Sequence, residues 1–184
     1  MIKRSLFIFL LLVASVSLLQ AATLQKRDHL TDKEVDLVKE AQVLDKRIDV
    51  FIKAAERRLI VINNSAAANA KQLKKDSERW GELPTGTRAE LVSDIARILD
   101  EAITNIDDVS TRDERNPLIP KALRKLAQAV NTMMAQLKPL ATEAKGDAEV
   151  ASFELLNEGA ESIIAATNKL PPEVEKKAKK NEKK

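Results

Sequence analysis

Residues 31–80 read TDKEVDLVKEAQVLDKRIDVFIKAAERRLIVINNSAAANAKQLKKDSERW. Apolar or small residues recur in this stretch at steps of three or four, which places them on one face of an α-helix. The spacing predicts one long helix, and the helices that follow it must cover its apolar face. That face comprises Leu37, Ala41, Leu44, Ile48, Phe51, Ala55, Leu59, Ile62, Ala66, Asn69, Leu73, Ser77 and Trp80.

Local signals mark both ends of this helix and one weak point inside it. Thr31 and Glu34 form a predicted capping box, in which each side chain accepts a hydrogen bond from the other residue's backbone N–H. At the far end, Gly81 suits the turn after Trp80 because glycine adopts a positive φ without strain. Residues 63–65, Asn-Asn-Ser, are poor helix formers. Two alternatives therefore stay open: a continuous or bent helix, which the unbroken apolar spacing favours, or a turn at residues 63–65.

A second helix is predicted to begin at another capping box, formed by Thr87 and Glu90, after a turn at residues 83–86. It is expected to end near Val109, before a charged loop at residues 110–116. It can then cover one side of the first helix. Its apolar face comprises Leu91, Ile95, Ile98, Ala102, Ile106 and Val109.

The third helix has the most regular apolar repeat in the chain and is predicted to be its most buried element. Pro117 and Pro120 fit its first turn, because the backbone N–H groups there have no acceptor within the helix and the N–H that proline lacks is not needed. Pro139 is expected to kink the last turn or to end the helix near Lys138. The steps alternate between four and three residues, as in coiled-coil-like bundles. The repeating positions are Ile119, Leu123, Leu126, Val130, Met133, Leu137, Leu140 and Ala144.

A fourth helix is predicted between the break at residues 145–147 and Pro171, with Gly159 expected to permit close approach of a neighbouring helix. No segment alternates between apolar and polar residues as a strand does. The fold class is therefore predicted to be all-α: an antiparallel helical bundle of four or five helices with a long first helix, after an N-terminal signal peptide. The apolar face of the fourth helix comprises Val150, Phe153, Leu156, Ala160, Ile163, Thr167 and Leu170.

Residues 1–22 have the features of a secretory signal peptide. Lys3 and Arg4 supply a basic start, residues 6–19 are almost entirely apolar, and Ala21 and Ala22 are small residues at which cleavage can occur. Cleavage is expected after Ala21 or Ala22, and the alternative is an uncleaved anchor, although the apolar run is short for a membrane span. The chain has no cysteine, which favours a bacterial periplasm or exterior.

The composition divides the chain into a signal peptide at residues 1–22, a helical bundle domain at residues 23–172 and a tail at residues 173–184. The tail holds six lysines, three glutamates and one valine, so it is expected to be disordered. The whole chain has a net charge of +3, and residues 23–172 have a net charge of −2. Because the domain has no basic stripe interleaved with aromatic residues, no nucleic-acid partner is expected. The tail is expected to associate at most weakly with anionic surfaces.

No catalytic or cofactor-binding residue is predicted, and no cofactor is expected. The sequence has no cysteine, no Gly-x-Ser-x-Gly turn and no glycine-rich phosphate loop. His29 is the only histidine and precedes the apolar pattern, so a solvent-exposed position is expected. Met133 is interpreted as a core residue. Trp80 is interpreted as a plug over one end of the core, with its indole N–H reaching a turn carbonyl. The chain is therefore not expected to be an enzyme.

No metal site is predicted from the carboxylates. Di-metal sites in bundles need an inward Glu-x-x-His pair on two helices, which this sequence lacks. Asp107, Asp108, Asp113 and Glu114 surround one loop, but the central glycine of a calcium loop is missing. Two acidic ridges are interpreted as solvated faces: Asp32, Asp36 and Glu40, and Glu154, Glu158 and Glu161.

Residues 30–34, Leu-Thr-Asp-Lys-Glu, resemble the Leu-Thr-x-x-Gln motif that begins helices in periplasmic helical chaperones. Glu34 occupies the position at which the motif has glutamine, and the pattern occurs once in the chain. The two sequences therefore share a helix cap. The leading interpretation is an exported, non-catalytic helical protein that acts by surface contact with a protein partner, as adaptor, scaffold or chaperone-like factor. The alternatives are a metal- or cofactor-carrying bundle and a membrane-associated protein that uses an uncleaved signal or the basic tail.

Overall fold

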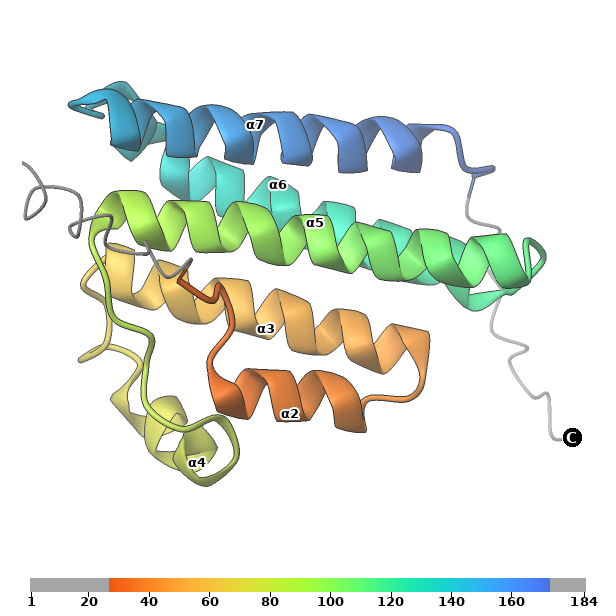
Figure 1. Ribbon diagram of the computed structural model, residues 1–184, viewed down its shortest axis with the longest axis horizontal. Helices are drawn as coiled ribbons and strands as arrows, with labels where there is room; N and C mark the ends of the chain where they lie inside the picture. The colour runs from red at the N-terminus through yellow and green to blue at the C-terminus, as the bar shows by residue number, and fades with distance from the viewer. Residues whose placement is uncertain (1–26, 173–184) are drawn as a thin grey trace, which may run out of the picture.

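The computed structural model describes residues 27–172, which form six α-helices and no strand (Figure 1). The predicted all-α class is confirmed, and the helices pack as a bundle. The signal peptide predicted at residues 1–22 and the tail predicted at residues 173–184 lie outside the described residues. The helices are α2 (Asp32–Glu40), α3 (Leu44–Ile62), α4 (Ala70–Trp80), α5 (Arg88–Arg112), α6 (Leu118–Thr142) and α7 (Asp147–Asn168).

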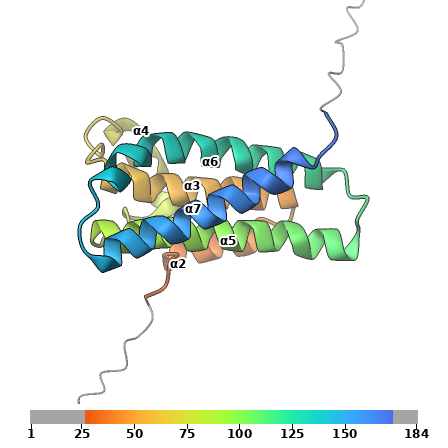
Figure 2. The ribbon, with the colours of Figure 1, turned by 90° about the horizontal axis from the view of Figure 1, so that it is seen from above.

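The four longest helices form the bundle, and the two short ones cover one side of it. Figure 1 shows α3, α5, α6 and α7 running alternately in opposite directions, as predicted for an antiparallel arrangement. α7 packs on α5 and α6, and α3 packs on the opposite side of the same pair. Seen from above, α7 crosses α5 obliquely (Figure 2). α2 and α4 lie on the far side of the molecule from α7 (Figure 1).

The predicted long first helix is wrong, because residues 31–80 form three helices. The first break, between α2 and α3, has no glycine or proline. Side chains bind the carbonyls at the end of α2 instead: Gln42 donates from Nε2 to the Lys39 carbonyl at 2.6 Å, and Arg47 donates from Nε to the Ala41 carbonyl at 2.9 Å. Leu37 and Leu44 are both buried, although a turn lies between them. The regular apolar spacing therefore gives no sign of this turn.

The second break falls at residues 63–65, the alternative that the sequence left open. Asn63 caps α3, and Asn64 adopts a left-handed conformation with a φ of 51°. The N–H of Ser65 donates to the Ile60 carbonyl at 3.0 Å, and the N–H of Asn64 donates to the Val61 carbonyl at 3.1 Å. These two bonds are the Schellman arrangement that ends a helix. Asparagine is the residue other than glycine that best tolerates this conformation.

The predicted starts of α2 and α5 are confirmed, but α5 ends later than expected, and of the two outcomes expected from Pro139 the end near Lys138 is wrong. Both capping boxes are present, and Gly81 has a positive φ of 65° after α4. α5 continues beyond Val109 to Arg112, because the N–H of Asp113 closes one more turn on the Val109 carbonyl at 2.8 Å. α6 passes through Pro139 and ends at Thr142. Proline at an exposed last turn removes one hydrogen bond that water can replace.

The prediction that the third helix, now α6, is the most buried element is also wrong. α3 has ten buried residues among its 19, whereas α6 has seven among 25. The reason is position: α3 contacts α2, α5 and α6, so three sides of it are covered. The α6 face itself is confirmed, since Leu126, Val130 and Met133 are buried in the common core. No helix within residues 27–172 is long and apolar enough to cross a membrane.

Candidate functional site

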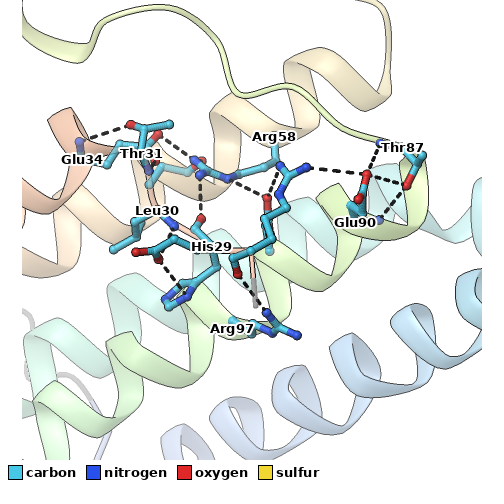
Figure 3. Close-up of polar contacts among 12 residues, drawn as sticks. His29, Leu30, Thr31, Glu34, Arg58, Thr87, Glu90 and Arg97 are labelled. Carbon is cyan, nitrogen blue, oxygen red and sulfur yellow. Dashed lines mark hydrogen bonds and ion pairs between the residues drawn. The ribbon is translucent and has the colours of Figure 1, made fainter. Parts of the chain in front are cut away.

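Four charged side chains are buried together between α2, α3 and α5. This polar cluster consists of Glu34, Arg57, Arg58 and Asp94, and each is at most 2% exposed. Oε1 of Glu34 accepts hydrogen bonds from Nε of Arg57 at 3.2 Å and from Nη1 of Arg58 at 2.6 Å. Its other oxygen accepts the N–H of Thr31 at 2.9 Å, which completes the capping box (Figure 3). One carboxylate therefore caps its own helix and compensates two buried cations.

Arg57 links the polar cluster to the turn that follows α4. Its Nη2 donates to the carbonyls of Trp80 at 3.1 Å, Gly81 at 3.2 Å and Glu82 at 2.5 Å. Its guanidinium also lies 5.7 Å from the centre of the Trp80 ring, within the range of a cation–π contact. Burial lowers the pKa of Arg57, and the Glu34 carboxylate opposes that shift. The predicted plug is confirmed in that Trp80 is buried in the core cluster, but Arg57 binds the turn carbonyls.

Arg58 fixes the segment that precedes α2. Its Nη2 donates to the carbonyl of His29 at 2.6 Å, and its Nη1 also donates to the carbonyl of Ala54 at 2.9 Å. Nε2 of His29 lies 2.8 Å from a carboxylate oxygen of Glu101 on α5. The expected solvent-exposed position of His29 is therefore wrong, because its side chain is only 25% exposed and contacts Glu101 of α5. The histidine contributes to attachment of this segment.

Asp94 connects the polar cluster to the outer surface. Its Oδ2 accepts a hydrogen bond from Nη2 of Arg27 at 2.8 Å. Burial raises the pKa of Asp94, and the charges of Arg27 and Arg58 oppose that shift. Nη1 of Arg27 also lies 3.6 Å from Glu90, and Nη1 of Arg97 donates to the Arg27 carbonyl at 3.5 Å. Figure 3 shows Arg58 above Arg97, with Glu90 to one side. Arg27 and Arg97 thus form the boundary between the buried cluster and solvent.

A groove runs along this boundary between α5 and α7. It consists of two adjoining hollows of about 500 Å³ and 310 Å³, and Arg97 and Leu155 line both. Alanine, serine and glycine supply much of the remaining lining. We call the whole the α5–α7 groove. The first hollow adds Arg27, Ala89, Glu90, Ser93, Asp94, Ala148, Ala151 and Ser152, and the second adds Ala96, Asp100, Glu158 and Gly159.

Two large hydrophobic residues are exposed on α7. In the part of the chain that the structure describes, three large hydrophobic residues are exposed, and two of them, Val150 (41%) and Leu155 (45%), lie on α7. The expectation that Val150 belongs to the buried face is therefore wrong. Phe153 and Leu156 fill the space against α5 and α6, and Val150 points away from it.

Gly159 does not have the role predicted from the sequence. A Cβ atom at this position would meet no other atom within 4 Å, so no neighbouring helix of the bundle approaches it closely. Gly159 instead lines the open second hollow of the groove. Glycine inside a helix is destabilising by roughly 0.5–1 kcal/mol relative to alanine. Packing within the described chain therefore supplies no reason for glycine here.

The remaining residues considered from the sequence lie as follows. Met133 is buried in the core, which confirms its interpretation. The residues of the two acidic ridges, at positions 32, 36 and 40 and at positions 154, 158 and 161, are exposed, which confirms that they are solvated faces. The four acids around residues 107–114 are exposed too. Among residues 27–172, no group of three or more histidine, cysteine, aspartate or glutamate residues has the arrangement of a metal site.

A second ion group joins α3 to α6 away from the groove. Asp45 is buried and accepts hydrogen bonds from Nζ of Lys125 at 2.7 Å and from Nζ of Lys121 at 3.0 Å. Lys125 also donates to Asp49 at 2.8 Å. The hydrogen bonds from Lys125 and then Lys121 hold the pKa of Asp45 below its usual value. This group ties two bundle helices together, and its charges are compensated locally.

Sequence reasoning missed both the polar cluster and the α5–α7 groove. Arg57 and Arg58 are adjacent charges in a helix, and such residues are usually solvated. The one available signal is that Arg57 and Arg58 are adjacent. Neighbouring residues point about 100° apart on a helix, so at least one of the two arginines must face the core when the helix is covered on three sides. The chain shows no significant match to a protein-family model, a curated protein or a solved structure.

Proposed function

We propose that this protein is an exported, non-catalytic helical protein that acts by surface contact with a protein partner, as an adaptor, scaffold or chaperone-like factor, and that the α5–α7 groove is the contact surface. The single observation that carries the proposal is the exposure of Leu155 inside a groove lined by small side chains. Such a surface offers a partner apolar area and shape, together with charged side chains at its edges.

The charges around the groove support the same proposal. The charges of Arg27 and Asp94 compensate each other at 2.8 Å. By contrast, Arg97 lines both hollows and, within the described residues, has no carboxylate oxygen within 4.0 Å. A cation beside an apolar floor suits a protein surface that presents an apolar side chain and a carboxylate. Export is proposed from the features of residues 1–22 alone.

A photo-crosslinking amino acid at position 155 tests the proposal in cells of the organism that makes the protein. We expect covalent adducts to protein from position 155 and few from position 161, which is exposed on the same helix but belongs to the acidic ridge. Equal yields at the two positions, or none at either, would contradict the proposal. Elemental analysis of the purified protein supplies a second arm: a stoichiometric metal would favour the metal-carrying bundle instead.

A further inference from the structure

We propose that the partner at the α5–α7 groove is a second copy of this chain, docked so that the two α7 helices run antiparallel about a two-fold axis at Leu155. This inference rests on the proposed function, because it names the occupant of the same surface. Three features carry it: the order of residues along α7, the free space at Gly159, and the positions of Arg97 and Glu158.

The outer residues of α7 are arranged symmetrically about Leu155. Ala151 and Gly159 stand four residues before and after it, and Ala148 and Ser162 stand seven residues before and after it. These offsets place all five on one face of the helix. A two-fold interface is self-complementary, so each residue must fit the residue at the mirrored offset in the second copy. Small residues then face small residues, and the two leucines meet at the axis.

The space along this face allows two helices to approach closely. Ala148, Ala151, Leu155 and Ser162 are exposed, and a Cβ at Gly159 would meet nothing within 4 Å. Helices pack with axes about 8–10 Å apart, and small side chains at the contact permit the lower end of that range. The open space at Gly159 would therefore be filled by Ala151 of the second copy. This supplies the reason for a helical glycine that the isolated chain lacks.

Charge complementarity selects a second copy over an arbitrary apolar partner. Glu158, three residues after Leu155, faces in the antiparallel arrangement the position three residues before Leu155, which is Ser152. Ser152 and Arg97 line the same hollow. Glu158 of the second copy is thereby brought to Arg97, and symmetry forms this pair twice. Neither Arg97 nor Glu158 has an ion-pair partner within 4.0 Å among residues 27–172, so both charges are available.

Sedimentation equilibrium of the exported protein measures the association. We expect a reversible dimer with a dissociation constant in the micromolar range. Leu155→Glu places two like charges at the axis and should raise that constant at least about 100-fold. Val150→Glu is the matched control, because Val150 is equally exposed on α7 but lies off the symmetric face, and it should leave the constant unchanged. Arg97→Glu and Glu158→Arg should each weaken the dimer about 10-fold, and the double variant should restore it.

Disulfide trapping tests the orientation, since the chain has no cysteine of its own. Ala151→Cys and Gly159→Cys proteins are mixed and mildly oxidised. An antiparallel dimer brings position 151 of one copy next to position 159 of the other, within the Cα separation of about 7 Å that a disulfide needs. We expect the mixed disulfide to dominate over either homodimeric one, and Leu155→Cys to cross-link to itself.

Several results would overturn the inference. These are a protein that stays monomeric at every concentration, a dimer that survives Leu155→Glu, and homodimeric disulfides at position 151, which indicate a parallel arrangement. The two proposals fail separately. If position 155 photo-crosslinks to a different protein while the purified chain is monomeric, the contact surface stands and the second copy is excluded. If position 155 gives no adduct at all, both proposals are wrong.

Discussion

The polar cluster and the outer face of α7 use their residues in opposite ways. Glu34, Arg57 and Arg58 are charged and fully enclosed, whereas Leu155 is apolar and 45% exposed. Enclosing charges is costly unless each is paired and hydrogen-bonded, and the contacts of Glu34 meet that condition. Exposing Leu155 is unfavourable as well, and no contact within the described chain offsets it. The charges of the polar cluster are therefore compensated within the fold, whereas the exposure of Leu155 is the basis on which we propose a contact surface on α7.

The largest effect that tests this comparison is loss of the carboxylate in the polar cluster. Glu34→Ala leaves Arg57 and Arg58 buried without their common acceptor and removes the half of the capping box in which the Glu34 carboxylate accepts the N–H of Thr31. We expect the free energy of unfolding to fall by about 3–5 kcal/mol, as when one partner of a buried pair is removed. Urea unfolding monitored by circular dichroism measures it.

Asp36→Ala is the control for that experiment, because Asp36 is an exposed acid on the same helix. Its effect should lie within about 0.5 kcal/mol. Similar effects for the two variants would show that the cluster does not stabilise the fold and would remove one side of the comparison.

The ion group at Asp45 is a second buried charge, and its contribution to the free energy of unfolding should depend on pH. Hydrogen bonds from Lys125 and then Lys121 lower the pKa of Asp45 in the folded protein. The resulting stabilisation is fully present above the unfolded value of about 3.9 and is lost as the pH falls through the folded value. Asp45→Asn should therefore reduce the free energy of unfolding at pH 7 by about 1–2 kcal/mol.

Denaturant unfolding from neutral to strongly acidic pH checks that prediction. The difference between the original chain and Asp45→Asn should shrink to nothing below the folded pKa of Asp45. A difference that is independent of pH would mean that the two lysines do not stabilise the ionised carboxylate.

Val43 is a second exposed hydrophobic residue to compare with Leu155, because it lies at the start of a helix and not on the proposed contact surface. It is 51% exposed and stands at the N-cap of α3 without a side-chain hydrogen bond. Val43→Ser supplies a hydroxyl that can accept a free N–H of the first turn, so the free energy of unfolding should rise by about 1 kcal/mol. Thermal melts measure it. Dimerisation should be unaffected, because Val43 lies at the start of α3, and α3 lies on the other side of α5 and α6 from α7 (Figure 1).

The smallest effect is expected at Gly159. Gly159→Ala should raise the free energy of unfolding by roughly 0.5–1 kcal/mol, because alanine is the better helix former and its Cβ meets nothing within the chain. The same change should weaken the dimer, since that Cβ occupies the space assigned to Ala151 of the second copy. A variant that gains stability and keeps full association would contradict the close approach of the two α7 helices.

Much of the fold follows from the sequence because it depends on neighbouring residues. Thr31 with Glu34 and Thr87 with Glu90 mark two helix starts, and the apolar repeat of α6 marks its buried face. These signals are local, so no knowledge of the partner helices is needed. The break after α2 was missed because side chains of Gln42 and Arg47 form it, and neither residue is a turn former in general.

The buried face of α7 could be predicted only in part, because periodicity does not distinguish two apolar faces of one helix. Val150 and Phe153 both fit the repeat of α7, yet Phe153 is buried and Val150 is exposed. Which of the two faces the core depends on where α5 and α6 lie, and that is a tertiary property. The burial of Arg57 and Arg58 has the same origin, because it depends on α2 and the turn after α4 covering α3.

Hydroxyl-radical footprinting of the unmodified protein tests the central claim most directly, because it measures the solvent exposure of individual side chains without a mutation. Leu155 and Val150 have nearly equal exposure in the single chain. At low protein concentration we expect the two residues to be oxidised at similar rates relative to their intrinsic reactivities. At concentrations at which the protein associates, Leu155 should become protected while Val150 stays reactive. If Leu155 remains as reactive as Val150 at every concentration, the α5–α7 groove is not an interface between copies of this chain.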